Sequence, residues 1–130
     1  MFLHIQYGNG LAVYDQIVRQ VKFAVAEGAL VTGDLVPSVR ELARELAINP
    51  NTVARAYRQL QDDGVLETVR GTGLAVTTAA RRQCQSERAK LIRARLRQVL
   101  QEAQHSGLEA DQIAELVDAE LTTIRRSQQK

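Results

Sequence analysis

The fold is decided by residues 38–64, which read SVRELARELAINPNTVARAYRQLQDDG. Ser38 and Glu41 have the spacing of a capping box, in which the serine hydroxyl accepts from the backbone N–H of residue 41 while the glutamate reaches back to the cap. Asn49 followed by Pro50 marks a second helix start, because asparagine is a preferred N-cap and proline suits the first helical position. Two short helices with so brief a break are typical of a helix-turn-helix.

Apolar side chains recur at three- and four-residue steps in both helices and indicate which faces are buried. The expected core positions are Val39, Leu42, Ala43 and Leu46 in the first helix and Val53, Ala56, Tyr57 and Leu60 in the second. At 100° per residue, the opposite face of the second helix carries Asn51, Arg55, Arg58 and Gln59. The second helix therefore presents a polar face to its surroundings, and Gly64 ends it.

The segments on either side complete a small domain. Residues 11–27 carry an apolar stripe at helical spacing, and Gly28 follows it. Residues 65–76 form two β-prone runs around a turn at residues 70–73, which predicts a hairpin. A hairpin directly after a helix-turn-helix is a wing. We therefore predict a mainly α fold with a small β wing, with a winged helix-turn-helix domain over residues 1–78.

Residues 79–130 contain two more apolar stripes separated by Gly107, which predicts an antiparallel helical hairpin. Such a pair has little interior of its own, so its stripes need a partner, most simply a second copy. We expect a homodimer through this tail. The predicted interface residues are Ile92, Leu96, Val99, Leu100, Ile113, Val117, Leu121 and Ile124.

Charge is uneven along the 130 residues, although 17 Lys and Arg against 15 Asp and Glu give a net charge of only +2. Residues 1–78 hold seven basic and eight acidic side chains, whereas residues 79–130 hold ten basic and seven acidic ones. The excess of positive charge lies in the basic stretch 81–97. These arginines either contact phosphates, or form a solvated helix face, or pair across a dimer with acids of the last helix.

Composition excludes several other classes. A single cysteine cannot form an intramolecular disulfide, and one cysteine with two histidines does not supply a cluster of zinc ligands. The sequence has no apolar run near the ~20 residues of a membrane span and no secretory signal pattern at its start. It also lacks a nucleophile–base pair, a glycine-rich phosphate loop and a carboxylate cluster. We expect a cytoplasmic protein that is not an enzyme, needs no cofactor or metal and does not enter membranes.

Three stretches, residues 33–43, 49–57 and 63–73, resemble the DNA-binding domain of GntR-type bacterial transcription regulators. The two-helix tail is similar to that of the YtrA subfamily, whose members dimerise through it and lack a large effector domain. The resemblance implies a sequence-specific regulator of double-stranded DNA, more often a repressor than an activator. Val36 stands where the family usually has leucine, and Leu74-Ala75 stands where it usually has threonine and an aromatic residue. The second difference lies in the wing, so the resemblance supports DNA contacts by the wing less strongly.

The candidate DNA contacts follow from this resemblance together with the exposed face of the second helix. They are Ser38, Arg40, Asn49, Asn51, Thr52, Arg55, Arg58, Arg70 and Gly71. Structural alternatives stand beside several of them. In these alternatives Arg40 pairs with Asp34, Glu41 or Glu45, and Arg58 pairs with Asp62. Asn49 then serves only as a helix cap, and Arg70-Gly71 forms only the turn of the hairpin.

Two other functions remain open at this stage. A winged helix can serve as a protein-interaction module, or as an architectural DNA binder without sequence preference. The polar face between Asn51 and Gln59 favours DNA, because a protein-docking face would carry more aromatic or apolar anchors. A small-molecule effector with a dedicated domain is not expected, although a ligand between domain and tail remains possible.

Overall fold

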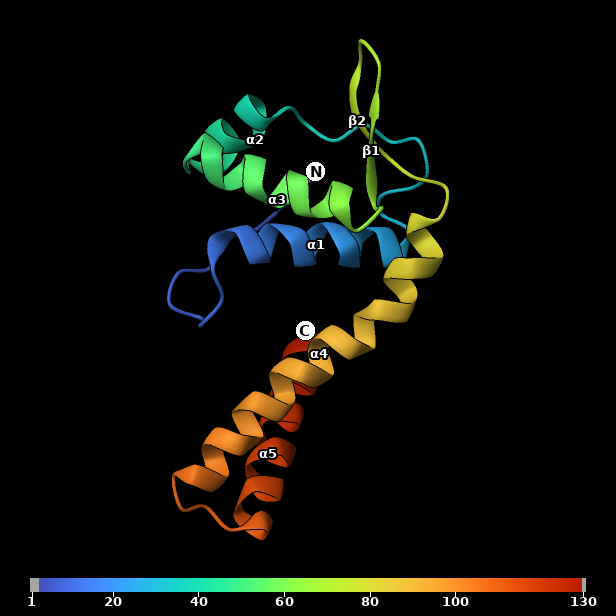
Figure 1. Ribbon diagram of the computed structural model, residues 1–130. Coiled ribbons are helices and arrows are strands. Elements are labelled where there is room, and N and C mark those ends of the chain that lie inside the picture. The colour runs from blue at the N-terminus through green and yellow to red at the C-terminus, as the bar shows by residue number, and fades with distance from the viewer. Residues whose placement is uncertain (1–2, 130) are drawn as a thin grey trace. The chain divides into compact units, whose positions relative to one another are not determined.

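The structure is a computed structural model that describes residues 3–129 (Figure 1). Its elements are α1 (Val13–Glu27), α2 (Val39–Leu46), α3 (Pro50–Asp62), β1 (Leu66–Val69), β2 (Gly73–Val76), α4 (Ala80–His105) and α5 (Ala110–Gln128). The predicted fold class, mainly helical with a small β wing, is confirmed. The chain forms two compact units, Met1–Ala89 and Lys90–Lys130, and each is described by itself.

The core of the first unit lies between α1, α2 and α3. Its largest fully buried side chains include Ile17 and Val21 of α1, Leu42 of α2 and Leu60 of α3. These are the apolar positions that helical spacing predicts. Burying a side chain of this size stabilises a fold by about 1.5–3 kcal/mol, so this cluster is the main source of the unit's stability.

The turn between α2 and α3 depends on one unusual backbone conformation. Ala47, the residue after α2, has φ 54° and ψ 48°, in the left-handed region that favours glycine. Its N–H donates to the carbonyls of Ala43 and Arg44, which closes the last turn of α2. Two residues later Asn49 caps α3, so only three residues separate the two helices.

The wing is a two-stranded antiparallel sheet with a third segment added at its edge. β1 pairs with β2 in a register that places Leu66 opposite Val76. Leu35 forms an isolated antiparallel bridge with Ala75, and the N–H of Val36 donates to the carbonyl of Leu74 at 3.0 Å. The loop before α2 therefore anchors the wing, and the buried Ala75 supports it despite its departure from the family pattern.

The start of α4 belongs to the first unit. Ala80 and Cys84 are 0% and 1% exposed and complete the core. The division between compact units therefore falls within α4, between Ala89 and Lys90. The reason is that the helix buries apolar side chains against the domain before it enters the tail.

The second unit consists of the remainder of α4 and of α5, joined by a turn at Gly107, whose φ is 96°. Leu100 and Ile113 are half-buried between the two helices, and no residue is buried within 90–129. Seven large apolar side chains in this unit remain exposed: Ile92, Leu96, Val99, Leu116, Val117, Leu121 and Ile124.

Across residues 3–129, none of the helices combines the length and the apolar character that crossing a membrane requires.

Candidate nucleic-acid interface

The exposed face of α3 is the one that the sequence predicts. Val53, Ala56, Tyr57 and Leu60 are buried, while Asn51, Arg55 and Arg58 are exposed and Thr52 is half-buried. The buried side chains fix the rotation of the helix about its axis. The amide, hydroxyl and guanidinium groups on the other face are therefore held in a set order along one rigid element.

The N-terminus of α3 is capped and open to solvent. The side-chain Oδ1 of Asn49 accepts from the backbone N–H of Asn51 at 2.8 Å, which establishes Asn49 as the N-cap. Asn49, Pro50 and Asn51 are all exposed. The partial positive charge of a helix N-terminus favours anions such as phosphate, so capping and DNA contact are compatible roles for this turn.

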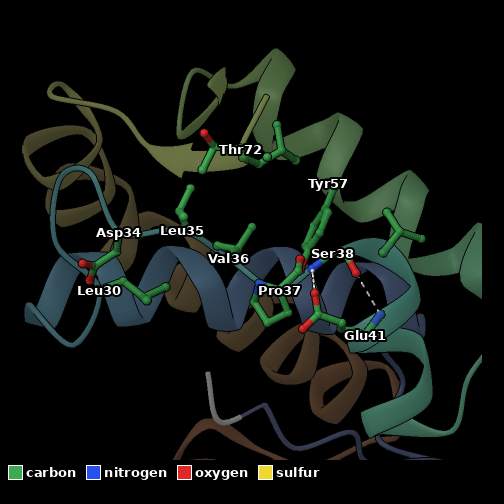
Figure 2. Close-up of a pocket in the computed structure, with 12 residues that line it drawn as sticks. Leu30, Asp34, Leu35, Val36, Pro37, Ser38, Glu41, Tyr57 and Thr72 are labelled. Atoms are coloured by element: carbon green, nitrogen blue, oxygen red, sulfur yellow. Dashed lines mark hydrogen bonds between the residues drawn. The ribbon is translucent and has the colours of Figure 1, made fainter. Parts of the chain in front are cut away.

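The start of α2 carries the predicted capping box. The N–H of Glu41 donates to Ser38 Oγ at 3.1 Å, and the N–H of Ser38 donates to Glu41 Oε1 at 3.2 Å (Figure 2). Arg40 lies in this first turn with its side chain exposed. Within residues 3–129 it makes no ion pair with Asp34, Glu41 or Glu45, so its guanidinium is available to a ligand.

A tyrosine joins α3 to the loop before α2. The hydroxyl of Tyr57 donates to the carbonyl of Pro37 at 2.7 Å. Burial raises the pKa of this hydroxyl above its ordinary value, so it stays a neutral donor at physiological pH. The bond fixes the position of the α2 N-terminus relative to α3, the two elements that carry most of the candidate contacts.

A cleft of about 630 Å³ lies between the start of α2 and the wing (Figure 2). Ser38 and Glu41 line it on one side, and Thr72, Gly73 and Leu74 of the wing line it on the other. The cleft separates two of the three segments that carry candidate contacts. A rod-shaped ligand that touches both segments would therefore cross it.

The wing tip is exposed and tightly turned. Arg70 and Gly71 are both exposed, and the N–H of Thr72 donates to the carbonyl of Val69 at 2.9 Å across the turn. Gly71 has φ 77°, which a residue with a side chain rarely adopts, so the turn itself requires glycine here. The β1–β2 hairpin projects beyond the helices of the domain (Figure 1).

Arg55 has a partner that sequence reasoning missed. Its guanidinium carbon lies 3.7 Å from the centre of the Tyr14 ring, in the first turn of α1. Stacking of this kind engages the face of the guanidinium and leaves its in-plane N–H donors free. Arg55 and Tyr14 are 41 positions apart, and no periodicity within α1 or α3 reports on a contact of this range.

The acidic residues at the end of α3 differ in their surroundings. Asp63 accepts from Lys22 Nζ at 2.8 Å and from Gln59 Nε2 at 2.9 Å. Asp62 is exposed, and in the described part of the chain Arg58 forms no ion pair with it. The carboxylate of Asp63 is thus neutralised on the domain side, and Arg58 keeps its positive charge unpaired.

Comparisons with known proteins establish the family of the chain. Residues 13–76 match the family described as bacterial regulatory proteins, gntR family. The chain is similar to the HTH-type transcriptional repressor YtrA of Bacillus subtilis, with 35% identity over 115 residues and 88% of each chain covered.

Two solved structures are similar over most of their length. One is a transcriptional regulator from Oenococcus oeni, with TM-score 0.61, 34% identity, and 92% of this chain and 99% of that chain covered. The other is YtrA from Sulfolobus acidocaldarius, a GntR-family transcription factor, with TM-score 0.56, 28% identity, and 95% and 99% covered. The chain therefore belongs to the gntR family of bacterial regulatory proteins, and it is a sequence-specific DNA-binding transcription regulator rather than an enzyme.

Proposed function

We propose that the protein is a cytoplasmic repressor that binds a near-palindromic operator as a homodimer. The observation that carries the proposal is the exposed polar face of α3, set between two further exposed arginines. Arg40 stands at the start of α2 and Arg70 at the wing tip, and neither forms an ion pair within residues 3–129. The proposed contacts are Ser38, Arg40, Asn49, Asn51, Thr52, Arg55, Arg58, Arg70 and Gly71.

In this mechanism α3 enters the major groove, where amide and guanidinium groups can address base edges. Asn51 and Arg55 are the proposed readers of sequence. Arg40, Arg70 and the N-terminus of α3 hold phosphates and fix the register of the domain on the duplex. Because each neutralised phosphate releases condensed counterions, we expect binding to weaken steeply as salt rises.

The tail supports the proposal of a dimer. Leu96 and Leu121 are 49% and 44% exposed, although each belongs to an apolar stripe at helical spacing. Leu100 and Ile113 line an apolar groove of about 640 Å³ between α4 and α5. A second copy of the tail would cover this surface, so we propose residues 1–78 as the DNA-binding part and 79–130 as the dimerisation part. Two recognition helices would then meet half-sites about one helical turn, or a multiple of it, apart.

Selection of bound sequences from random DNA by the purified protein tests the proposal. We expect enrichment of an inverted repeat, which would support sequence readout and twofold symmetry together. Enrichment of a single half-site would contradict the dimer. An absence of any enriched sequence would overturn the operator proposal and favour a protein-interaction module or an architectural binder.

Two arginine variants separate readout from phosphate binding. We expect Arg55→Ala to relax base preference at one position of each half-site, at a cost of about 1–3 kcal/mol on the preferred base. Arg70→Ala should weaken binding to all DNA sequences by a similar factor. It should also reduce the slope of log affinity against log salt concentration by about one for each lost phosphate contact. Gel-shift titrations over several salt concentrations measure both. Arg126→Ala, at the far end of α5, is the matched control, and unchanged operator affinity in either test variant would remove that residue from the interface.

A further inference from the structure

Arg44 is an exposed arginine of the helix-turn-helix that lies outside the proposed DNA contacts. It stands one helical turn after Arg40 on α2. The two arginines line a concave surface of about 530 Å³ together with Ala43, Ile48 and Pro50. Because Pro50 is the first residue of α3, this surface lies beside the start of the recognition helix.

The charges of α2 are separated around its axis. Arg40 and Arg44 lie about 40° apart around the helix, while Glu41 and Glu45 lie about 100° further round. Glu41 lines the cleft toward the wing instead. Among the described residues that line the concave surface, none is acidic. The flank of α2 beside the start of α3 is therefore basic.

The two arginines are not neutralised within the domain. Across residues 3–129, neither of them forms an ion pair. Arg44 lies in the last turn of α2, where the helix dipole favours a cation, but Arg40 lies in the first turn, where the same dipole disfavours one. Like charges four residues apart also destabilise a helix. An anion bound at this flank would relieve both costs.

The floor of the concave surface strengthens its charge. Ala43 is 4% exposed and Ile48 is half-buried, so the floor is apolar. The N–H of Ile48 donates to the carbonyl of Ala43 at 3.0 Å, which fixes the turn beneath the arginines. A hollow with one sign of charge and walls of low polarity focuses the electric field. The planar guanidinium group matches two phosphate oxygens at once, so phosphate is the anion that fits best.

The place of α2 in the fold indicates where that phosphate comes from. In helix-turn-helix proteins the second helix enters the major groove, and the first helix crosses the sugar–phosphate backbone. Here α2 is the first helix. Arg40 and Arg44 are separated by a rise of about 6 Å along it, which suits two neighbouring anions better than one.

We propose that Arg44 binds a DNA phosphate next to the one bound by Arg40 on the same strand, so that α2 holds two successive phosphates. This inference rests on the proposed contact of Arg40 with DNA. In this arrangement Arg44 touches no base and adds affinity without sequence preference.

The first test compares Arg44→Ala with the wild type in gel-shift titrations of the selected operator and of an unrelated duplex, at several salt concentrations. We expect binding to both duplexes to weaken by about tenfold, as for the loss of one charge-assisted hydrogen-bonded contact. The slope of log affinity against log salt concentration should fall by about one. Arg44→Lys keeps the charge, so its slope should equal that of the wild type and its affinity should stay within about threefold.

Arg126→Ala removes the same charge from the end of α5 and is the matched control, with no expected change in affinity or slope. Urea unfolding of every variant separates binding from stability. If Arg44 only stabilises the end of α2, Arg44→Ala lowers the unfolding midpoint and leaves the salt slope unchanged, which overturns the proposal.

The second test locates the phosphate. Single phosphates of one half-site are replaced in turn by uncharged methylphosphonates. We expect one replacement to weaken the wild type by about tenfold and to have no further effect on Arg44→Ala. The neighbouring replacement on the same strand should behave in the same way toward Arg40→Ala.

The outcomes distinguish this inference from the proposed function. An unchanged salt slope in Arg44→Ala, a changed base preference, or the lack of any phosphate linked to Arg44 overturns the inference while Arg40→Ala still weakens binding. If Arg40→Ala also binds both duplexes like the wild type, the proposed contact of Arg40 fails, and the inference falls with it.

Discussion

The two units use similar apolar residues in opposite ways. In the first, Ile17, Leu42 and Leu60 are 0% exposed, whereas in the second Val99 and Ile124 are 53% and 52% exposed. Tertiary packing therefore holds the helices of the domain, while α5 and the distal part of α4 depend on their own backbone bonds and on contact with each other. Helices with so little burial are marginal in water. The contrast teaches that an apolar stripe at helical spacing predicts which face of a helix is apolar, but not whether that face packs within the same chain.

The strongest way to sharpen this contrast is to shorten one buried and one exposed side chain. We expect Leu60→Ala to lower the free energy of unfolding of the domain by about 2–5 kcal/mol, because it leaves a cavity in a packed core. Leu116→Ala should change it by less than about 1 kcal/mol, because Leu116 is 53% exposed and lies outside the proposed interface. Urea unfolding followed by circular dichroism measures both, and equal losses would show that the tail has a core comparable to that of the domain.

A charge in the tail tests what covers the exposed stripe. Leu96→Asp would place a carboxylate in the proposed interface, and we expect it to sediment as a monomer at concentrations where we expect the wild type to form dimers. Affinity for the full operator should fall roughly 100-fold, because the two DNA-binding domains no longer bind as one linked pair. Affinity for an isolated half-site should stay unchanged. Gln98→Asp adds the same charge at an exposed position two residues away and serves as the control. A Leu96→Asp protein that remains dimeric would place the interface elsewhere.

The smallest expected effect concerns the bond between α3 and the loop before α2. Tyr57→Phe removes only the hydroxyl that donates to the Pro37 carbonyl, and should cost about 0.5–1.5 kcal/mol of stability. The same substitution at Tyr7, which is 74% exposed, is the control and should have no measurable effect. Denaturant midpoints are precise enough to separate them. No difference between the two variants would remove this bond from the account of how α2 is positioned.

Local signals predicted most of the domain. The Ser38–Glu41 box, the Asn49 cap and the apolar stripes all depend on residues within one or two turns of each other, and each is present in the structure. The polar face of α3 followed from the same spacing. Helix position and rotation are therefore accessible from the sequence alone.

Contacts between distant residues were not predicted, for a physical reason. The Arg55–Tyr14 stack, the Leu35–Ala75 bridge and the pairing of Lys22 with Glu87 each join segments far apart in the chain. Periodicity says which face of an element is apolar, but it does not identify the partner that lies across from a polar side chain. The burial of Cys84 has the same cause, because it depends on a surface formed by other elements.

The burial of Cys84 has a practical consequence for measuring motion. The thiol is 1% exposed, and burial raises its pKa to about 11, so little thiolate exists or is reachable in the closed molecule at pH 8. Alkylation must then proceed through states in which the base of α4 has separated from the domain. Since the chain has a single cysteine, the rate of its modification by a simple thiol reagent reports all openings, local or global, that expose the base of α4.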